Sequence, residues 1–116
     1  MNPLGTRGEQ VAAKYLKDKG YIIADKNFRT PLGEIDIICK YKDTLIFVEV
    51  KTRTSNYKTE PYTAVNYKKR LHAKRAILLY VKEKKVQSMK LRYDIISIIV
   101  SGDSHSIEHI ENVDLE

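Results

Sequence analysis

The sequence has a single cysteine, Cys39, and no apolar run long enough to cross a membrane. One thiol excludes an internal disulfide and a cysteine-based zinc site, which agrees with a reducing compartment. A membrane span needs about 18 apolar residues, and the first residues lack the apolar segment of a signal peptide. We therefore expect a cytoplasmic protein with no membrane partner, in which Cys39 belongs to the core.

Motifs of several common enzyme classes are also missing. The chain has no Gly-rich phosphate loop and no Ser/His/Asp arrangement, so nucleotide-binding and acyl-transfer enzymes can be set aside. His72, His105 and His109 show no metal-ligand spacing, and we expect them at the surface. The 116 residues contain no repeat or low-complexity linker and fit one domain. We expect this domain over residues 1–112 and a fraying acidic tail over 113–116.

Basic residues are concentrated in one part of the chain. The net charge is +6, but residues 1–102 hold 21 basic and 10 acidic residues, a net of +11. Between Lys51 and Lys85, eleven Lys or Arg face only Glu60 and Glu83. Such a concentration attracts a polyanion such as DNA through phosphate contacts and counterion release. A solvated basic surface is an equally good interpretation, so charge alone does not decide the function.

Helical and strand periods alternate along the chain, which indicates an α/β fold. The expected elements are a helix over 8–19 ended by Gly20, strands over 21–29, 34–41 and 44–51, a helix over about 65–84, and strands over 93–100 and 106–110. The second helix has apolar residues at Tyr67, Leu71, Ile77, Leu78 and Val81. A helix between two apolar strands implies a parallel crossover. The sequence therefore predicts a mixed sheet of four to five strands with flanking helices.

Three charged residues form the strongest chemical signal. Glu49 interrupts an otherwise apolar strand, and Lys51, two residues on, projects from the same side. If the preceding turn is centred between Lys42 and Asp43, Asp36 lies directly opposite Glu49. Opposed, half-buried carboxylates are destabilising unless a cation compensates them. Because Mg²⁺ accepts one or two carboxylates together with phosphate and water, Asp36 and Glu49 are suitable ligands for Mg²⁺ or Mn²⁺.

Two further residues belong to this hypothesis. Lys51 beside the metal could orient or help deprotonate an attacking water, or stabilise charge that develops in the transition state. Glu9 adds a third carboxylate at the start of the first helix, and its spacing to Ala12 and Leu16 turns it partly toward the core. A helix N-terminus also favours an acid for electrostatic reasons alone. A purely dipole-stabilising role is therefore the alternative for Glu9.

The segments Gly33–Ile38 and Phe47–Arg53 resemble the small bacterial YraN-like family, which is related to the archaeal-type Holliday junction resolvases. The resemblance covers nearly the whole chain up to the acidic tail. It implies the restriction-endonuclease-like three-layer fold of the PD-(D/E)xK nucleases, with an αβββαβ core. It also implies a catalytic centre in which the metal-binding acids are Asp36 and Glu49, the active-site lysine is Lys51 and the helix-one acid is Glu9.

This resemblance implies a metal-dependent endonuclease that hydrolyses DNA phosphodiester bonds at branched or junction DNA, in recombination or repair. Related resolvases cut as dimers, so a homodimer is a further expectation. The Asp-x(12)-Glu-x-Lys spacing alone is degenerate, and an exposed ion-paired hairpin is its structural alternative. The functional alternative is a non-catalytic nucleic-acid-binding module that retains the fold and the basic surface.

Candidate contacts to DNA surround the predicted crossover region. Phosphate contacts position DNA without reading its sequence, and the candidates for them are Arg53, Lys68, Lys69, Arg70, Lys74 and Arg75. Tyr57 and Tyr62 could stack on unpaired bases or simply pack locally. Arg92 and Asp94 match the family's pattern, although an ion pair at a strand end explains them equally well.

Overall fold

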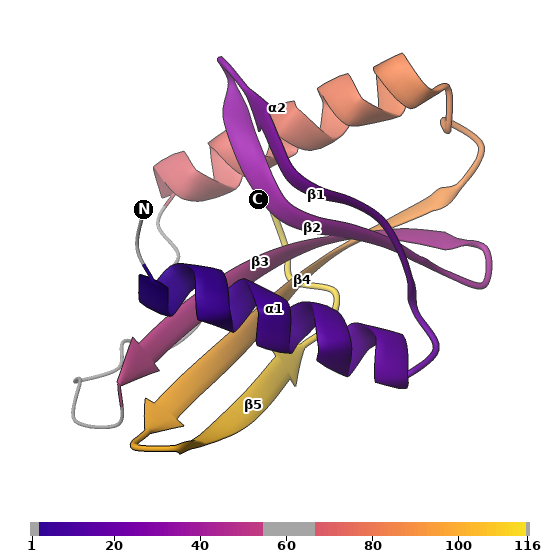
Figure 1. The fold of residues 1–116 in the computed structure, drawn as a ribbon. Coiled ribbons are helices and arrows are strands. Elements are labelled where there is room, and N and C mark those ends of the chain that lie inside the picture. Colours follow the sequence, from indigo (N-terminus) through magenta and orange to yellow (C-terminus); the bar gives the residue numbers. More distant parts are fainter. Residues whose placement is uncertain (1–2, 55–66, 116) are drawn as a thin grey trace.

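A computed structural model describes residues 3–54 and 67–115 as two helices and five strands (Figure 1). In chain order these are α1 (Pro3–Asp18), β1 (Ile22–Thr30), β2 (Gly33–Tyr41), β3 (Thr44–Thr54), α2 (Tyr67–Lys84), β4 (Lys90–Ser101) and β5 (Ser104–Ile110). Each expected element is found. The first helix begins at Pro3 rather than Gly8, and the predicted start of the second helix at residue 65 lies outside the described residues.

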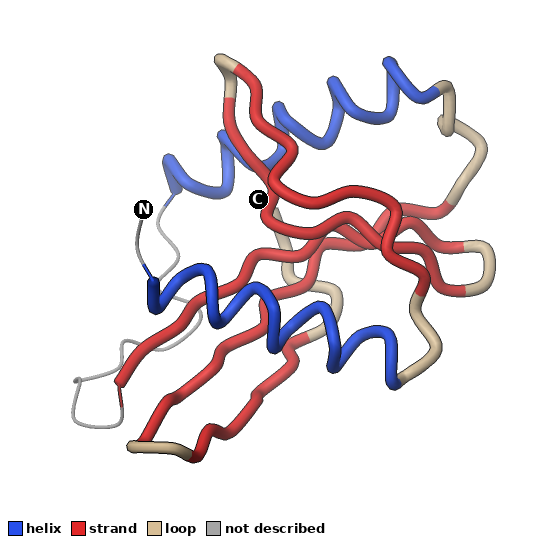
Figure 2. The backbone as a smooth tube through the Cα atoms, viewed as in Figure 1, coloured by secondary structure: helices blue, strands red, loops and turns tan. Residues whose placement is uncertain are grey.

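The strands form one mixed sheet in the order β1-β2-β3-β4-β5. The first three strands are an antiparallel meander, β4 runs parallel to β3 after the α2 crossover, and β5 is antiparallel to β4. The two helices lie on opposite faces of this sheet (Figures 1 and 2), so the fold has three layers. This confirms the predicted α/β class. Neither described helix is long and apolar enough to span a membrane.

Each helix covers its own apolar cluster. The α2 residues that pack on the sheet are Ala73, Ala76, Ile77, Tyr80 and Val81, against Ile35, Ile38, Leu45, Phe47, Tyr93 and Ile95. Leu78, expected on the apolar face, is 57% exposed because the buried stripe runs through its smaller and aromatic neighbours. On the α1 side, Cys39 is fully buried as predicted. Burial raises the pKa of its thiol to about 12, so Cys39 is a core residue and not a reactive thiolate.

Residues 113–115 are docked, contrary to the prediction that the chain frays after Asn112. The backbone N–H of Val113 donates to the carbonyl oxygen of Tyr93 at 2.7 Å. Val113 and Leu115 pack against the apolar cluster under α2, while Asp114 stays exposed. Apolar and acidic residues alternate in this segment, so one edge of an extended chain is buried and its charges remain in water.

The β1–β2 hairpin is fixed against α2 at its tip. The Thr30 hydroxyl oxygen accepts hydrogen bonds from the backbone N–H groups of Leu32 and Gly33, both at 3.0 Å. A Cβ atom on Gly33 would lie 2.2 Å from the backbone oxygen of His72. Glycine is therefore required here for close approach of two backbones.

Gly33→Ala should lower the free energy of unfolding by about 2–3 kcal/mol, because neither backbone can yield without separating the hairpin from the helix. Urea denaturation measures the loss. Gly102→Ala is the control: a Cβ there meets no atom within 4 Å, and only its positive φ of 59° is strained, a cost of about 1 kcal/mol. An unchanged midpoint for Gly33→Ala would contradict the close contact.

Candidate functional site

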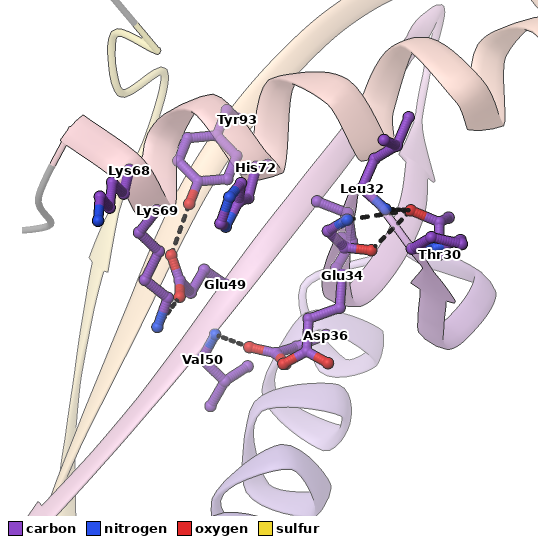
Figure 3. Close-up of a pocket in the computed structure, with 14 residues that line it drawn as sticks. Thr30, Leu32, Glu34, Asp36, Glu49, Val50, Lys68, Lys69, His72 and Tyr93 are labelled. Carbon is purple, nitrogen blue, oxygen red and sulfur yellow. Dashed lines mark hydrogen bonds and ion pairs between the residues drawn. The ribbon is translucent and has the colours of Figure 1, made fainter.

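Strands β2 and β3 separate where the two predicted metal ligands lie. The ladder keeps the predicted register, in which paired numbers sum to 85, from the turn as far as Ile37↔Val48. It ends there, one residue before the expected pair of Asp36 and Glu49. The backbone N–H of Val50 donates instead to Oδ2 of Asp36 at 2.8 Å (Figure 3). The strands therefore bring both acids to one place, but not as a directly opposed pair.

A break in the side-chain alternation of β2 accompanies this separation. Ile35 packs in the cluster under α2, whereas Ile37 packs in the cluster under α1. In a regular strand, residues two apart share a face. The backbone therefore rotates around Asp36, and its carboxylate satisfies a β3 amide that a regular ladder would pair with a carbonyl.

Both acids line a cleft of about 690 Å³ on the α2 side of the sheet. Its walls come from the hairpin tip, the start of α2 and the diverging strands; the lining residues are Thr30 to Asp36, Glu49, Val50, Lys68, Lys69, His72, Ala73 and Tyr93. Figure 3 shows Glu49 pointing toward Lys69 and Tyr93, and Asp36 pointing toward Val50. The cleft thus combines the two inner carboxylates of Asp36 and Glu49, and the exposed one of Glu34, with two lysines.

Glu49 is 8% exposed, and both of its carboxylate oxygens have partners. The Tyr93 hydroxyl donates to Oε2 at 2.6 Å, and the Lys69 ammonium lies 2.5 Å from Oε1. Burial raises the pKa of Tyr93, and the adjacent Glu49 charge raises it further. Tyr93 therefore stays a protonated donor, which fixes the orientation of the Glu49 carboxylate.

Asp36 is in an environment that opposes its ionisation. Burial raises its pKa to about 6, although the hydrogen bond from Val50 opposes the shift. The negative charges of Glu49 and Glu9 raise the pKa further, and the positive charge of Lys69 lowers it. The Asp36 carboxylate therefore lies in a poorly solvated position beside two other negative charges, where a bound cation would favour its ionised form.

In the presence of a chelator, wild type should lose stability relative to Asp36→Asn as pH rises. The folded pKa of Asp36, about 6, lies above its usual value of 3.8. Between these values the folded state binds more protons than the unfolded state, so the free energy of unfolding falls with pH. We expect Asp36→Asn to be more stable than wild type at pH 7 by on the order of 2 kcal/mol, and equal to it near pH 3. Urea midpoints from pH 3 to 8 test this, and parallel curves would contradict it.

Glu9 lies on α1 close to the end of β3. The helix approaches that strand at Gly8, where a Cβ atom would be 1.7 Å from the hydroxyl oxygen of Thr52. The charge of Glu9 reaches Asp36, as the raised pKa shows, but Glu9 does not line the cleft. Within residues 3–54 and 67–115, no three His, Cys, Asp or Glu side chains are grouped to hold a metal ion. A metal here would therefore have two protein carboxylates, with Glu9 further out.

Lys51 shares the face of the two acids but not their cleft. It follows Glu49 by two residues in β3, so strand alternation places both on the same side. Lys51 is half-buried, and its backbone is paired with Ser97 of β4. Arg53 continues the same face toward the end of the strand. Both residues follow Glu49 in the chain and lie nearer the C-terminal end of β3.

The six predicted phosphate contacts do not form a single patch. Lys68 and Lys69 line the cleft, whereas Lys74 lines a second groove between α2, β4 and the C-terminal residues. Arg70 lies near enough to Tyr93 to lower its pKa, and Arg75 is exposed on α2. Tyr57 and Tyr62 lie outside the described residues. Of the six candidate phosphate contacts, Lys68 and Lys69 therefore share the cleft of Asp36 and Glu49.

Arg92 and Asp94 belong to a buried network on the other face of the sheet. Asp94 is fully buried and accepts hydrogen bonds from Arg92 Nε and Nη2 at 2.9 and 2.8 Å and from the backbone of Asn112 at 3.0 Å. His109 Nε2 lies 2.8 Å from the same carboxylate, and the opposite ring nitrogen contacts Tyr15. Burial raises the pKa of Asp94, but its hydrogen bonds to His109 and Arg92 outweigh this and hold it below the usual value.

This network corrects one prediction and decides another. His72 and His105 are exposed as expected, but the side chain of His109 is only 4% exposed, because Asp94 from the neighbouring strand and Tyr15 from α1 enclose it. Arg92 and Asp94 form the ion pair that was the structural alternative. They join β4, β5 and the C-terminal residues and lie away from the cleft.

Tyr93 is the residue of the site that the sequence did not identify. Its parity in β4 is opposite to that of Asp94, so it faces α2 and Glu49. A tyrosine in an apolar strand is a weak signal by itself. Tyr93 lies beside Glu49 because Phe47 of β3 pairs with Tyr93 of β4. This register cannot be predicted from nearby sequence, since the long α2 crossover separates the two strands in the chain.

Comparison with known proteins gives a consistent assignment. The model of the "Uncharacterised protein family UPF0102" matches residues 8–98. The chain is a member of this UPF0102 family. A UPF0102 protein of Alkaliphilus oremlandii is 45% identical over 111 residues, which is 94% of this chain and 95% of the relative. UPF0102 proteins of Clostridium acetobutylicum and Syntrophomonas wolfei are 44% and 41% identical over 110 and 109 residues, covering 93% and 94% of this chain and 90% and 95% of their own.

The predicted resemblance to the YraN family is therefore confirmed. The matched UPF0102 segment contains all four predicted catalytic residues, from Glu9 to Lys51, and also Tyr93. It stops within β4, so β5 and the docked C-terminal residues are outside it. The acid-lined cleft thus belongs entirely to the family segment, whereas part of the Asp94 network does not.

Proposed function

We propose that this UPF0102 protein is a divalent-metal-dependent endonuclease that hydrolyses DNA phosphodiester bonds. The observation that supports it best is the pair of carboxylates, Asp36 and Glu49, at the wall of a cleft whose rim carries Lys68 and Lys69. Acids that bind a cation beside lysines that bind phosphate are the two halves of a metal-dependent phosphodiesterase site. The active-site class comes from the resemblance to PD-(D/E)xK nucleases.

The residues present fit a hard divalent cation. Asp36 and Glu49 offer only oxygen donors, and burial raises the pKa of Asp36 to about 6, so a bound cation would stabilise its carboxylate form. Mg²⁺ keeps several waters and uses one or two carboxylates together with substrate phosphate, so two protein ligands are sufficient. Mn²⁺ accepts the same ligands. When bound, such an ion supplies Lewis acidity to the phosphate and lowers the pKa of a coordinated water.

The protein's own residues divide the remaining tasks. Lys68 and Lys69 would bind the phosphate that enters the cleft, and Tyr93 orients the Glu49 carboxylate through its 2.6 Å hydrogen bond. Lys51, which lies nearer the C-terminal end of β3, is assigned to stabilising the charge that develops in the transition state. Glu9 would act from α1 by electrostatics on Asp36. Arg53, Arg70, Lys74 and Arg75 would extend the path of the DNA backbone around α2.

Branched or junction DNA in recombination or repair is the proposed substrate, on the strength of the likeness to Holliday junction resolvases. A homodimer would present two clefts to two strands of such a structure. The proposal places the protein with the chromosome in the cytoplasm, consistent with its single cysteine.

The proposal is tested by the metal dependence of strand breaks. Flap, four-way, single-stranded and linear duplex DNA should be incubated with wild type in Mg²⁺, Mn²⁺, Ca²⁺ or EDTA, and the products resolved on denaturing gels. We expect cleavage in Mg²⁺ and Mn²⁺ only. Salt-sensitive binding without breaks in any metal would contradict the endonuclease and support the non-catalytic binding module.

A further inference from the structure

The ammonium group of Lys69 contacts Glu49 where a bound metal ion would be expected. This group lies 2.5 Å from Oε1 of a carboxylate whose side chain is only 10% exposed, while the lysine side chain itself is 53% exposed. The other oxygen of the same carboxylate is held by Tyr93. Lys69 is also on the first turn of α2, beside Lys68, at the rim of the cleft. One end of the pair is therefore buried and fixed, and the other can reach solvent.

Asp36 and Glu49 have different partners in this cleft. Glu49 receives a positive charge from Lys69, whereas Asp36 accepts a hydrogen bond from the backbone N–H of Val50. A divalent cation bound by the two acids would take over the role of Lys69. It would compete with the ammonium for Oε1, because a carboxylate oxygen in contact with one cation has less affinity for a second. Metal binding therefore competes with Lys69 for Glu49.

A DNA phosphate offers the displaced lysine a new partner. A half-exposed lysine at a cleft rim lies within reach of a phosphate that enters the cleft, and an ammonium forms charge-assisted bonds with either anion. From these contacts we infer that Lys69 couples the two ligands: it holds Glu49 in the free protein and moves to DNA phosphate when metal and DNA bind together. The inference deepens the proposed function and depends on it. Lys69 is thus a positioning residue that keeps the metal centre weak until DNA arrives.

Reciprocity makes the coupling measurable without any cleavage. If DNA releases Glu49 from Lys69, DNA must raise the metal affinity, and metal must raise the DNA affinity by the same factor. Removing the ammonium should abolish the competition in the free protein. Lys69→Met retains most of the aliphatic stem and removes the charge, and Lys82→Met makes the same change on the exposed surface of the same helix, away from the cleft.

The experiment titrates Mn²⁺ into each protein and follows the free ion by electron paramagnetic resonance, first without DNA. We expect Lys69→Met to bind Mn²⁺ about tenfold more tightly than wild type, which corresponds to one charge-assisted pair, and Lys82→Met to differ from wild type by less than twofold. With saturating phosphorothioate duplex, the Mn²⁺ affinities of wild type and Lys69→Met should become equal. Glu49→Gln should bind Mn²⁺ weakly in both series. Thermal melting checks that every variant is folded, with Lys69→Gln as the replacement if Lys69→Met is not.

The possible outcomes separate this inference from the proposed function. Equal or weaker Mn²⁺ binding by Lys69→Met, with binding still dependent on Glu49, overturns the role of Lys69 and leaves the metal centre intact. Equal tightening by Lys82→Met overturns it as well, because the effect would then be general electrostatics. Failure of wild type and all variants to bind Mn²⁺ overturns the metal centre itself. A tenfold effect confined to Lys69 that disappears with DNA supports the coupling.

Discussion

Glu49→Gln should reduce metal-dependent DNA cleavage by on the order of 1,000-fold while the protein stays folded. Glutamine retains the shape of the side chain and can still accept the hydrogen bond from Tyr93. It cannot supply the negative charge that a divalent cation needs. Single-turnover rates on the DNA structure that wild type cuts fastest measure the effect, because they report the chemical step rather than product release.

A matched control separates this loss from a general change of charge. Glu83→Gln makes the same substitution on the exposed surface of α2 and should leave the cleavage rate within twofold of wild type. Tyr93→Phe should fall between them, with a loss of about 10- to 100-fold, since it removes only the hydroxyl that orients Glu49. A wild-type rate for Glu49→Gln would show that cleavage arises elsewhere or from a contaminating nuclease.

Local sequence was sufficient to predict the part of the site that lies on the β2–β3 hairpin. A turn centred between Lys42 and Asp43 predicted the register, and the ladder follows it as far as Ile37↔Val48. Hairpin register is set by the turn and by alternation, both of which are readable over a few residues. The separation of the strands at Asp36 was not predictable, because it depends on how Ile35 packs against the distant helix α2.

Errors arose where a partner comes from far along the chain. His109 was predicted at the surface because its own segment is polar, yet it is enclosed by Asp94 and by Tyr15, which is 94 residues away. Tyr93 was overlooked as a partner of Glu49 for the same reason, since the two strands join only through α2. A pattern of charges specifies what a residue can do. The tertiary contacts decide which partner it has.

The Asp94 network should contribute strongly to stability, because its carboxylate is fully buried and holds several partners at once. Asp94→Asn should lower the free energy of unfolding by about 3–5 kcal/mol, because it leaves Arg92 without its buried counterion. The added amide group also opposes the backbone N–H of Asn112 and a ring nitrogen of His109, which need an acceptor. Guanidinium or urea midpoints with an unchanged slope measure this loss.

Glu111→Gln is the control for Asp94→Asn, because Glu111 contacts the same guanidinium at 3.2 Å but is half-exposed. An exposed pair of this kind is worth at most about 1 kcal/mol, so the two losses should differ several-fold. The pH dependence gives a second check. The folded pKa of Asp94 is below its usual value, so its contribution is present at neutral pH and is lost as pH falls toward that pKa. If the two variants were equally stable at pH 7, the buried carboxylate would not organise this face of the sheet, and β5 and the C-terminal residues would have to be held by their apolar contacts alone.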